Sequence, residues 1–456
     1  VQGAISKLQQ RGHGCSTKLA LRLNQDSASS VLLYAFPLVD LTPARRLDLE
    51  GHHRRAVRAI LGLPRYSPVA ATLAEAGEWP LSLHMLQRAL GHVDRLHRAA
   101  DGRTLLERLR SQPRSRMGGL CALYHQMVPD QPVPVAPLPP HHQPPEVHLY
   151  LDGVTKHRTP AAALQQAAIS KLQQQLAGRL QVFTDGSVMP DGSAAAACVI
   201  PSRAISRQCL LPFPVSLTAA ELAGLHLAAD LLAEDVPAQP VAVLCDSKAA
   251  LHTLANHRRA GLTGSLLATK YRALAAAGTS VSFHWLPSHV GIAGNEEADT
   301  LAKAAHQLGT PITQAVAVRD YSQARIKKLL ASVHPDQRVA NGRGPRRLPE
   351  AGLTRRERAN LLRLRTGCVW TAARRYLKGC CASPACSRCG DPETLEHLLC
   401  ACPALAQERS RVTAAYRRHG LPATTLEHLL FPSRPHLPAL RSLVEFLDET
   451  GIMAYR

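Results

Sequence analysis

The amino-acid sequence predicts a central α/β domain with a mixed sheet, flanked on both sides by helical regions. Three runs of strand-forming residues joined by short polar turns open this domain. Helices and strands then alternate, an order typical of a sheet with both antiparallel and parallel strands. The expected strands are 180–184, 194–200, 205–211, 241–245 and 281–285, and the expected helices cover 219–234, start at 247, cover 266–277 and start at 296.

Residues 1–127 form the first flanking region, which we expect to be a helical arm. Apolar residues between Leu47 and Leu63 recur at near-helical spacing, with arginines between them. A break at Leu63-Pro64-Arg65 ends this pattern, and a second helical pattern follows from Leu81 to Leu96.

A proline-rich segment separates this arm from the central domain. Eight prolines lie between Pro129 and Pro145, too many for a helix or a central strand. We therefore expect a linker over 128–146, a helical lead-in over 147–177, the α/β domain over 178–310, and a basic helical region over 311–456.

The net charge of +20 is unevenly distributed along the 456 residues. It is +9 in 1–127, 0 in 128–177, −1 in 178–310 and +12 in 311–456. A basic excess on both sides of a neutral domain is what binding to phosphate groups requires, although arginines also solubilise exposed helices. No run of apolar residues is long enough to span a membrane and no secretion signal is present, so we expect an intracellular protein without a transmembrane segment.

Four acidic residues of the central domain stand at strand ends or helix starts. Asp185 and Asp246 end strands, while Glu221 and Asp299 lie in the first turns of helices. Carboxylates that share a cleft repel one another unless hard cations lie between them, so the set suggests a metal-dependent phosphodiesterase. Each has a structural alternative: a turn aspartate, the glutamate of a capping box begun by Thr218, a helix N-cap, and a charge at a helix dipole.

Four sequence blocks carry a family resemblance. They are Thr184-Asp185-Gly186-Ser187, the helix with Glu221, Cys245-Asp246-Ser247, and the segment 284–299, which contains His289-Val290-Gly291-Ile292 and ends in Asn295-Glu296-Glu297-Ala298-Asp299. In this order they resemble type 1 ribonuclease H, which cuts the RNA strand of RNA/DNA hybrids. The resemblance covers about residues 178–308 and implies the ribonuclease H fold, with a mixed five-stranded sheet flanked by helices.

The resemblance implies catalysis with two Mg²⁺ ions, for which Mn²⁺ is an alternative. Asp185, Glu221, Asp246 and Asp299 would be the metal ligands, and His289 a proton donor or product-release group. Gly186, Ser187 and Asn295 are expected to contact nucleic acid, and Asn295 also to cap a helix. The segment from Asp246 to His284 lacks the basic protrusion that some family members use to grip the hybrid, so the basic flanks would supply that grip.

A cysteine-rich segment forms the second chemical motif. Cys386, Cys389, His397 and Cys402 have the residue types and spacing of a tetrahedral Zn²⁺ site. Buried cysteines without metal are the alternative, and Cys400, Cys380 or Cys381 could replace a ligand. The motif resembles the Cys-Cys-His-Cys knuckle near the C-terminus of LINE-like elements. Upstream lies a basic run in which we expect nucleic-acid contacts from Arg363, Arg365, Arg374 and Arg375.

The flanks together resemble the C-terminal part of a non-LTR (LINE-like) retrotransposon polyprotein. Residues 1–127 resemble the region after a reverse transcriptase polymerase, but no Tyr-x-Asp-Asp motif is present, and the first residue is Val1 rather than methionine. The expected partners are RNA/DNA hybrid, single-stranded nucleic acid bound by the tail, and the missing polymerase portion, in a nuclear or cytoplasmic ribonucleoprotein. The competing hypothesis is a retrotransposon-derived protein that binds nucleic acid without cutting it.

Overall fold

The computed structural model describes residues 3, 15–35, 37–99, 101–129, 145–155, 158–256, 261–307, 309–312 and 319–452. Most of the expected proline-rich linker, residues 130–144, lies outside the described residues. The chain divides into two compact units, one formed by residues 1–89 and 328–456 and the other by residues 90–327. No helix in the described ranges is both long and apolar enough to cross a membrane.

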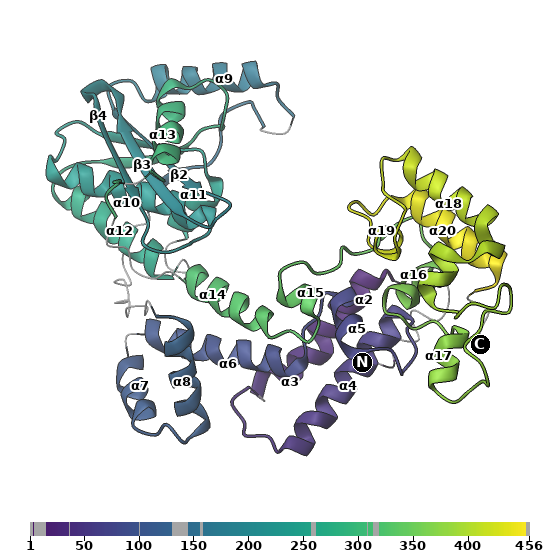
Figure 1. Cartoon of the computed structure of the whole chain (residues 1–456). Coiled ribbons are helices and arrows are strands. Elements are labelled where there is room, and N and C mark those ends of the chain that lie inside the picture. Colours follow the sequence, from purple (N-terminus) through teal and green to yellow (C-terminus); the bar gives the residue numbers. More distant parts are fainter. Residues whose placement is uncertain are drawn as a thin grey trace. The chain divides into compact units, whose positions relative to one another are not determined.

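The second unit contains a six-stranded mixed sheet with the strand order β1-β6-β5-β2-β3-β4. Strands β2, β3 and β4 of this sheet are labelled in Figure 1. β1, β6, β5 and β2 are parallel to one another, and β3 and β4 continue the sheet in antiparallel pairs. The strands are β1 (Glu146–His148), β2 (Leu180–Val188), β3 (Ala194–Ile200), β4 (Ile205–Leu210), β5 (Val241–Cys245) and β6 (Val281–Trp285). The predicted fold class is confirmed, but the sheet has six strands rather than five.

The additional strand, β1, lies in the segment expected to begin a helical lead-in. It has only three residues and pairs with β6 from Glu146↔Ser282 to His148↔His284. So short a strand leaves no alternating pattern in the sequence, and its existence depends on the exposed edge of β6. The rest of the lead-in contains the expected helical structure, as α9 (Ala161–Ser170) and the π-helix η2 (Lys171–Gln175).

Helices cover both faces of this sheet. α10 and α13 both pack on β2 and β3, while α11 and α12 pack beside α10. Every residue of the alanine-rich β3 is buried, because its small side chains let helices approach closely. The helices of this domain are α10 (Leu217–Glu234), α11 (Lys248–Ala255), α12 (Gly261–Ala276) and α13 (Ala293–Ala304), and the 3₁₀ turn η3 (Pro201–Arg203) joins β3 to β4.

The same unit contains a helical section joined by a buried polar cluster. Tyr124 donates a hydrogen bond to Asp94 at 2.6 Å, and Arg98 pairs with Asp94 at 3.0 Å and donates to Ser322. These contacts connect residues from α6 (Leu81–Arg98), α8 (Arg116–Met127) and α14 (Arg319–Ser332), and α7 (Gly102–Arg110) precedes α8. α6 and α14 each extend across the boundary between the two units.

The first unit is helical, and both ends of the chain build its core. Leu61 and Leu73 from the N-terminal segment are buried in one cluster with Leu362 and Leu440 from the C-terminal segment. The expected division into a separate arm and tail therefore differs from the structure. The elements of the first segment are α2 (Thr17–Asn24), the π-helix η1 (Gln25–Ser29), α3 (Ser30–Ala35), α4 (Pro43–Leu61) and α5 (Val69–Ala76).

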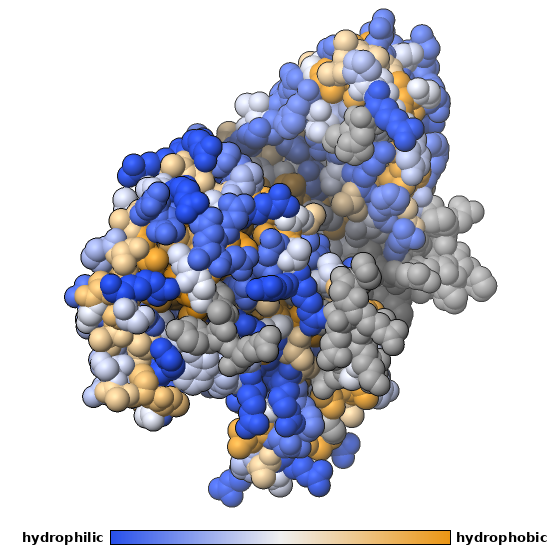
Figure 2. Space-filling view, turned by 90° about the vertical axis from the view of Figure 1, so that its right-hand side faces the viewer, coloured by the Kyte–Doolittle hydropathy of each residue, from blue (hydrophilic) through white to orange (hydrophobic). Residues whose placement is uncertain are grey.

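The C-terminal segment of this unit adds short helices around the cysteine-rich loop. Figure 2 shows one face of the chain, on which hydrophilic and hydrophobic residues are interspersed. The elements are α15 (Gln337–Ala340), α16 (Arg355–Arg365), α17 (Ala372–Leu377), the π-helix η4 (His397–Ala401), the 3₁₀ turn η5 (Pro403–Leu405), α18 (Ala406–Arg418), α19 (Leu426–Leu430) and α20 (Leu437–Thr450).

Candidate functional site

Strand register brings two of the predicted acids together. β2 and β5 are neighbouring parallel strands, and Thr184 is paired with Cys245. Asp185 and Asp246 each follow these paired residues. The prediction that Asp185 ends its strand is wrong, because β2 continues to Val188 and Asp185 pairs with Ala197 of β3, whereas Asp246 does follow the last residue of β5. Both acids lie at the carboxyl end of the parallel pair β2–β5. Ligands of α/β proteins commonly bind at the carboxyl ends of parallel strands.

The start of α10 adds the third acid. Ser216 is the N-cap, and its hydroxyl accepts a hydrogen bond from the Ala219 N–H, so Thr218 is not the cap and the capping-box alternative for Glu221 is wrong. Glu221 instead lies buried, 4% exposed, and faces the two aspartates. Gly186 permits this approach, because a Cβ there would lie 2.3 Å from the Glu221 backbone nitrogen.

Carboxylate oxygens of Asp185, Glu221 and Asp246 all lie within 4.8 Å of one another. Burial, followed by the charge of Asp246, raises the pKa of Asp185. Burial, followed by the charges of Asp185 and Asp246, raises the pKa of Glu221 to about 9. The three carboxylates therefore cannot all be ionised at neutral pH without a compensating cation.

Asp299 approaches the cluster from α13 on the other side. It lies close enough to Asp185 for its charge to add to burial and Asp246 in raising the pKa of Asp185, and its carboxylate pairs with Lys303 at 2.7 Å, one helical turn further on. Asp299 is thus close enough to join the cluster but lies outside the group of three. The Asp299–Lys303 spacing of four residues was visible in the sequence, although we did not predict the pair.

Two neighbours fix the position of Asp246. The Asn295 side chain donates a hydrogen bond to the Asp246 carboxylate at 3.4 Å, and the Trp285 indole donates to its backbone carbonyl at 3.0 Å. Asp246 is not the N-cap of α11, because Ser247 occupies that place. Asn295 is also not a cap: it lies buried inside α13, whose N-cap is Ile292. Its side chain supports Asp246, and its expected contact with nucleic acid stays a prediction.

His289 lies on an exposed loop before α13. Its backbone φ of +53° is in the left-handed region, one of two such non-glycine residues in the described part of the chain. The loop is tied to α9, since the Gln165 amide donates to the Gly291 carbonyl at 3.2 Å. No sequence pattern indicated Gln165, which is 126 residues away from its partner.

Comparison with known proteins assigns the domain that carries these acids. The RNase H family model matches residues 177–307. Residues 177–307 are an RNase H domain. Among solved structures, the N-terminal RNase H domain of a Mycobacterium tuberculosis protein, solved as a fusion with maltose binding protein, is similar at 23% identity, over 28% of this chain and 93% of that chain, with a TM-score of 0.23. RNase H1 from the halophilic archaeon Halobacterium salinarum is similar at 22% identity, over 28% of this chain and 97% of that chain, with a TM-score of 0.23. No curated protein matches the chain.

The second motif forms a compact cluster in the first unit. Ligand atoms of Cys386, Cys389, His397 and Cys402 lie within 4.8 Å of one another, and the Cys389 sulfur is 3.1 Å from His397 Nε2. Burial opposes ionisation of the Cys386 thiol, but backbone N–H groups that include that of Cys389 lower its pKa overall. Three thiols and an imidazole arranged in this way fit Zn²⁺.

The three alternative zinc ligands lie outside this cluster. The Cys380 thiol donates to the Lys378 carbonyl, and the Cys381 thiol donates to backbone carbonyls that include that of Ser383. Cys400 is half-buried nearby. The structure thus brings together the four residues that the spacing favoured.

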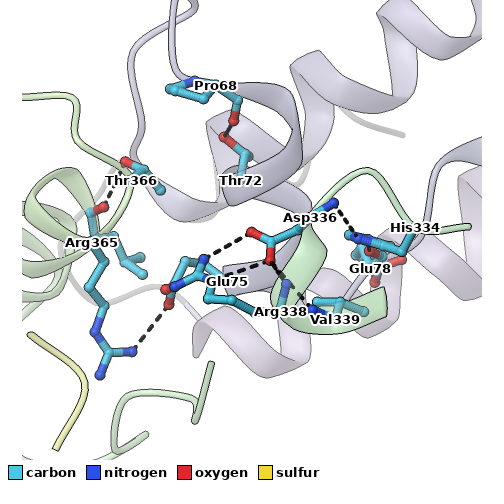
Figure 3. Close-up of polar contacts among 11 residues, drawn as sticks. Pro68, Thr72, Glu75, Glu78, His334, Asp336, Arg338, Val339, Arg365 and Thr366 are labelled. Carbon is cyan, nitrogen blue, oxygen red and sulfur yellow. Dashed lines mark hydrogen bonds and ion pairs between the residues drawn. The ribbon is translucent and has the colours of Figure 1, made fainter. Parts of the chain in front are cut away.

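The predicted basic run is divided between surface and interior. Arg365 pairs with Glu75 at 3.2 Å, and their side chains are 2% and 1% exposed (Figure 3). It also donates to the backbone carbonyls of Leu430 and Arg346. Its expected contact with nucleic acid is therefore wrong, because an arginine with a buried acid partner has become part of the core.

The other predicted contacts differ in exposure. Arg363, Arg374 and Arg375 are half-buried. Ser187 is half-buried at the end of β2, whereas Gly186 is buried against α10. Glycine at position 186 is therefore needed for helix packing, a reason that the sequence alone did not indicate.

Proposed function

We propose that the RNase H domain is a type 1 ribonuclease H that hydrolyses the RNA strand of RNA/DNA hybrids. The observation that carries this proposal is the group of three carboxylates from β2, α10 and the end of β5. Their mutual repulsion in a partly buried site is relieved by cations, and metal-assisted phosphodiester hydrolysis uses such a site.

The donor set fits Mg²⁺, or Mn²⁺ in its place, because hard cations prefer carboxylate oxygens. Asp185, Glu221 and Asp246 would hold two ions together with Asp299. Bound Mg²⁺ would supply an activated water and stabilise the leaving oxygen.

The remaining residues of the site orient these carboxylates and handle protons. Asn295 and Trp285 hold Asp246 in place, and Lys303 balances the charge of Asp299. His289 is exposed on its loop and can donate a proton to the leaving oxygen. Shape and the 2′-hydroxyls of the RNA strand would be read across the shallow minor groove, with Ser187 at the end of β2 as a contact.

We extend the proposal to the flanking regions, which would place the domain in a retrotransposon polyprotein that acts within an intracellular ribonucleoprotein. The net charge of +12 in residues 311–456 supports binding of single-stranded nucleic acid, and the Cys386–Cys402 cluster supports one Zn²⁺. The polymerase portion of such a polyprotein would be the natural partner, since it produces the hybrid.

Cleavage of a labelled RNA/DNA hybrid in the presence of Mg²⁺ tests the catalytic proposal, with duplex DNA and duplex RNA as controls. Asp185→Asn should abolish cleavage without unfolding the protein, because the amide keeps the shape of the side chain and removes a metal-binding charge. If wild-type protein binds the hybrid but leaves it intact, the chain is a nucleic-acid-binding protein instead. Retention of more than a few per cent of the activity in Asp185→Asn would show that the site is misplaced.

A further inference from the structure

Two aromatic rings of the first unit meet at its surface. The ring centroids of Tyr66 and Trp370 are 5.1 Å apart, and the Trp370 indole N–H donates a hydrogen bond to the Tyr66 hydroxyl. Tyr66 is 46% exposed and Trp370 is half-buried, so neither ring belongs to the buried core. Aromatic residues make up only 4% of the chain, which makes an exposed pair of them unusual.

An arginine completes this cluster. The Arg374 guanidinium carbon lies 5.5 Å from the Trp370 ring centroid and 5.9 Å from that of Tyr66. The guanidinium also donates to the Gly367 carbonyl, which fixes its position. Tyr66, Trp370 and Arg374 thus offer two rings and a planar cation, groups on which nucleic-acid bases stack.

The surrounding chain is basic. Residues 51–74, which contain Tyr66, include four arginines, and residues 358–390, which contain Trp370 and Arg374, include seven lysines and arginines, of which Arg358 and Arg365 are buried. Neither segment contains an aspartate or a glutamate. Arg65 and Lys378 are exposed in the same segments. This charge favours a polyanion over a protein or an apolar partner.

The two halves of the cluster are held rigidly, although they are about 300 residues apart in the chain. Arg58 donates to the Ser67 carbonyl at 2.6 Å, which fixes the turn that carries Tyr66. The buried Glu75–Arg365 pair joins the helices that follow Tyr66 and precede Trp370 (Figure 3). A rigid stacking surface binds more tightly because less conformational freedom is lost on binding.

The cluster is also connected to the cysteine-rich loop. The Ala372 N–H donates to the Glu393 carboxylate at 2.7 Å, and the Ala373 N–H donates to the Glu393 carbonyl. Glu393 lies between Cys389 and His397 in the chain. A strand bound at the aromatic cluster could therefore continue along the basic segment toward the candidate zinc site.

We propose that Tyr66, Trp370 and Arg374 form a stacking platform for unpaired bases of single-stranded nucleic acid. This inference rests on the proposed single-strand binding of the basic C-terminal region, and it assigns that binding to named side chains. It also gives residues of the N-terminal segment a direct part in binding.

Binding of the whole 456-residue chain to fluorescently labelled single strands tests this platform. The probes are a DNA strand of mixed sequence, an RNA strand of the same sequence, and an abasic DNA strand of equal length. Trp370→Ala should weaken binding of the first two by about 5- to 100-fold, as expected for the loss of one stacking partner. Binding of the abasic strand should be unchanged, because it has phosphates but no bases.

Matched variants separate stacking from folding and from charge. Tyr34→Ala removes a tyrosine that is 84% exposed elsewhere in the same unit and should leave binding unchanged. Trp370→Phe keeps a ring, so its dissociation constant for the single strands should stay within about 3-fold of the wild-type value. Arg374→Gln removes a charge, so the slope of the log binding constant against the log salt concentration should decrease by about 1. In the wild-type protein, 2-aminopurine in the bound strand should be quenched by stacking, a result that does not depend on any variant folding.

The platform is overturned if folded Trp370→Ala binds the single strands as wild type does, or if it loses the abasic strand equally. Unquenched 2-aminopurine in the wild-type complex, or binding of RNA alone, would also overturn it. If the wild-type protein binds no single strand, the single-strand role fails together with the platform. Hybrid cleavage measured on the same preparation decides the catalytic proposal separately.

Discussion

Gly186→Ala is the sharpest test of how the candidate active site is assembled. A Cβ at this position would lie 2.3 Å from the Glu221 nitrogen, 2.4 Å from the Ala220 carbonyl carbon and 2.7 Å from Glu221 Cα. Ordinary contacts of a Cβ begin at 3.4 Å. All three neighbours are backbone atoms, so no side chain can rotate away to make room.

The magnitude of the effect follows from this geometry. The start of α10 must retreat from β2 by roughly 1 Å, and Glu221 moves with it away from Asp185. A misplacement of about 1 Å in a catalytic group typically costs about 10²-fold in rate. The forced contact should also lower the free energy of unfolding by about 1–3 kcal/mol, the usual range for overpacking.

Hybrid cleavage and thermal unfolding of the same protein measure both effects. Gly186 is not among the glycines with positive φ, so alanine introduces a contact and no unfavourable backbone conformation. Gly51→Ala is the matched control, because a Cβ there meets nothing within 4 Å and the site lies in α4 of the other unit. A Gly186→Ala protein with wild-type cleavage rate and melting temperature would refute this account of the close contact between β2 and α10.

Three further perturbations test the carboxylates, the histidine and the candidate zinc site. Burial raises the pKa of Glu221 to about 9, so the folded protein keeps a proton that the unfolded chain releases at lower pH. In magnesium-free buffer the melting temperature should therefore fall as the pH rises from about 4.5 toward 9. Glu221→Gln should flatten this fall and raise the melting temperature at pH 8, and an unchanged pH profile would contradict the repulsion argument. His289→Ala should slow hybrid cleavage by about 10²-fold without changing Mg²⁺ affinity in a calorimetric titration, whereas a loss of affinity equal to that of Asp185→Asn would make His289 a ligand. The purified 456-residue chain should contain one zinc that is lost in Cys389→Ser and kept in Cys368→Ser, as measured by elemental analysis. Zinc retained in Cys389→Ser would exclude that ligand.

The helix starts beside Glu221 and Asp246 have local sequences that fit more than one structural role. A glutamate three residues after a threonine at a helix start, such as Glu221 after Thr218, is equally compatible with a capping box and with a metal site. Ser216 caps α10, which excludes the capping box for Glu221. Ser247 caps α11, which excludes the N-cap role for Asp246. Which hydroxyl caps a helix depends on where the backbone turns, and several candidates lie within a few residues of each other.

The sequence by itself determined the elements of the RNase H domain and the residues that could carry its chemistry. Strands and helices each produce their own period of apolar residues in the sequence. Cys386 and Cys389 have the Cys-x2-Cys spacing with which two thiols bind one zinc ion. These features depend only on residues a few positions apart in the chain, so the sequence alone is enough to predict them.

Only the tertiary structure decided which residues meet across long stretches of chain. It added β1 at the edge of β6, buried Arg365 against Glu75, and placed Gly186 against the backbone of α10. It also joined residues 1–89 to residues 328–456 around one core. The physical reason is that an arginine or a glycine has the same local signature whether its partner is water or a residue hundreds of positions away, and only packing brings that partner into contact.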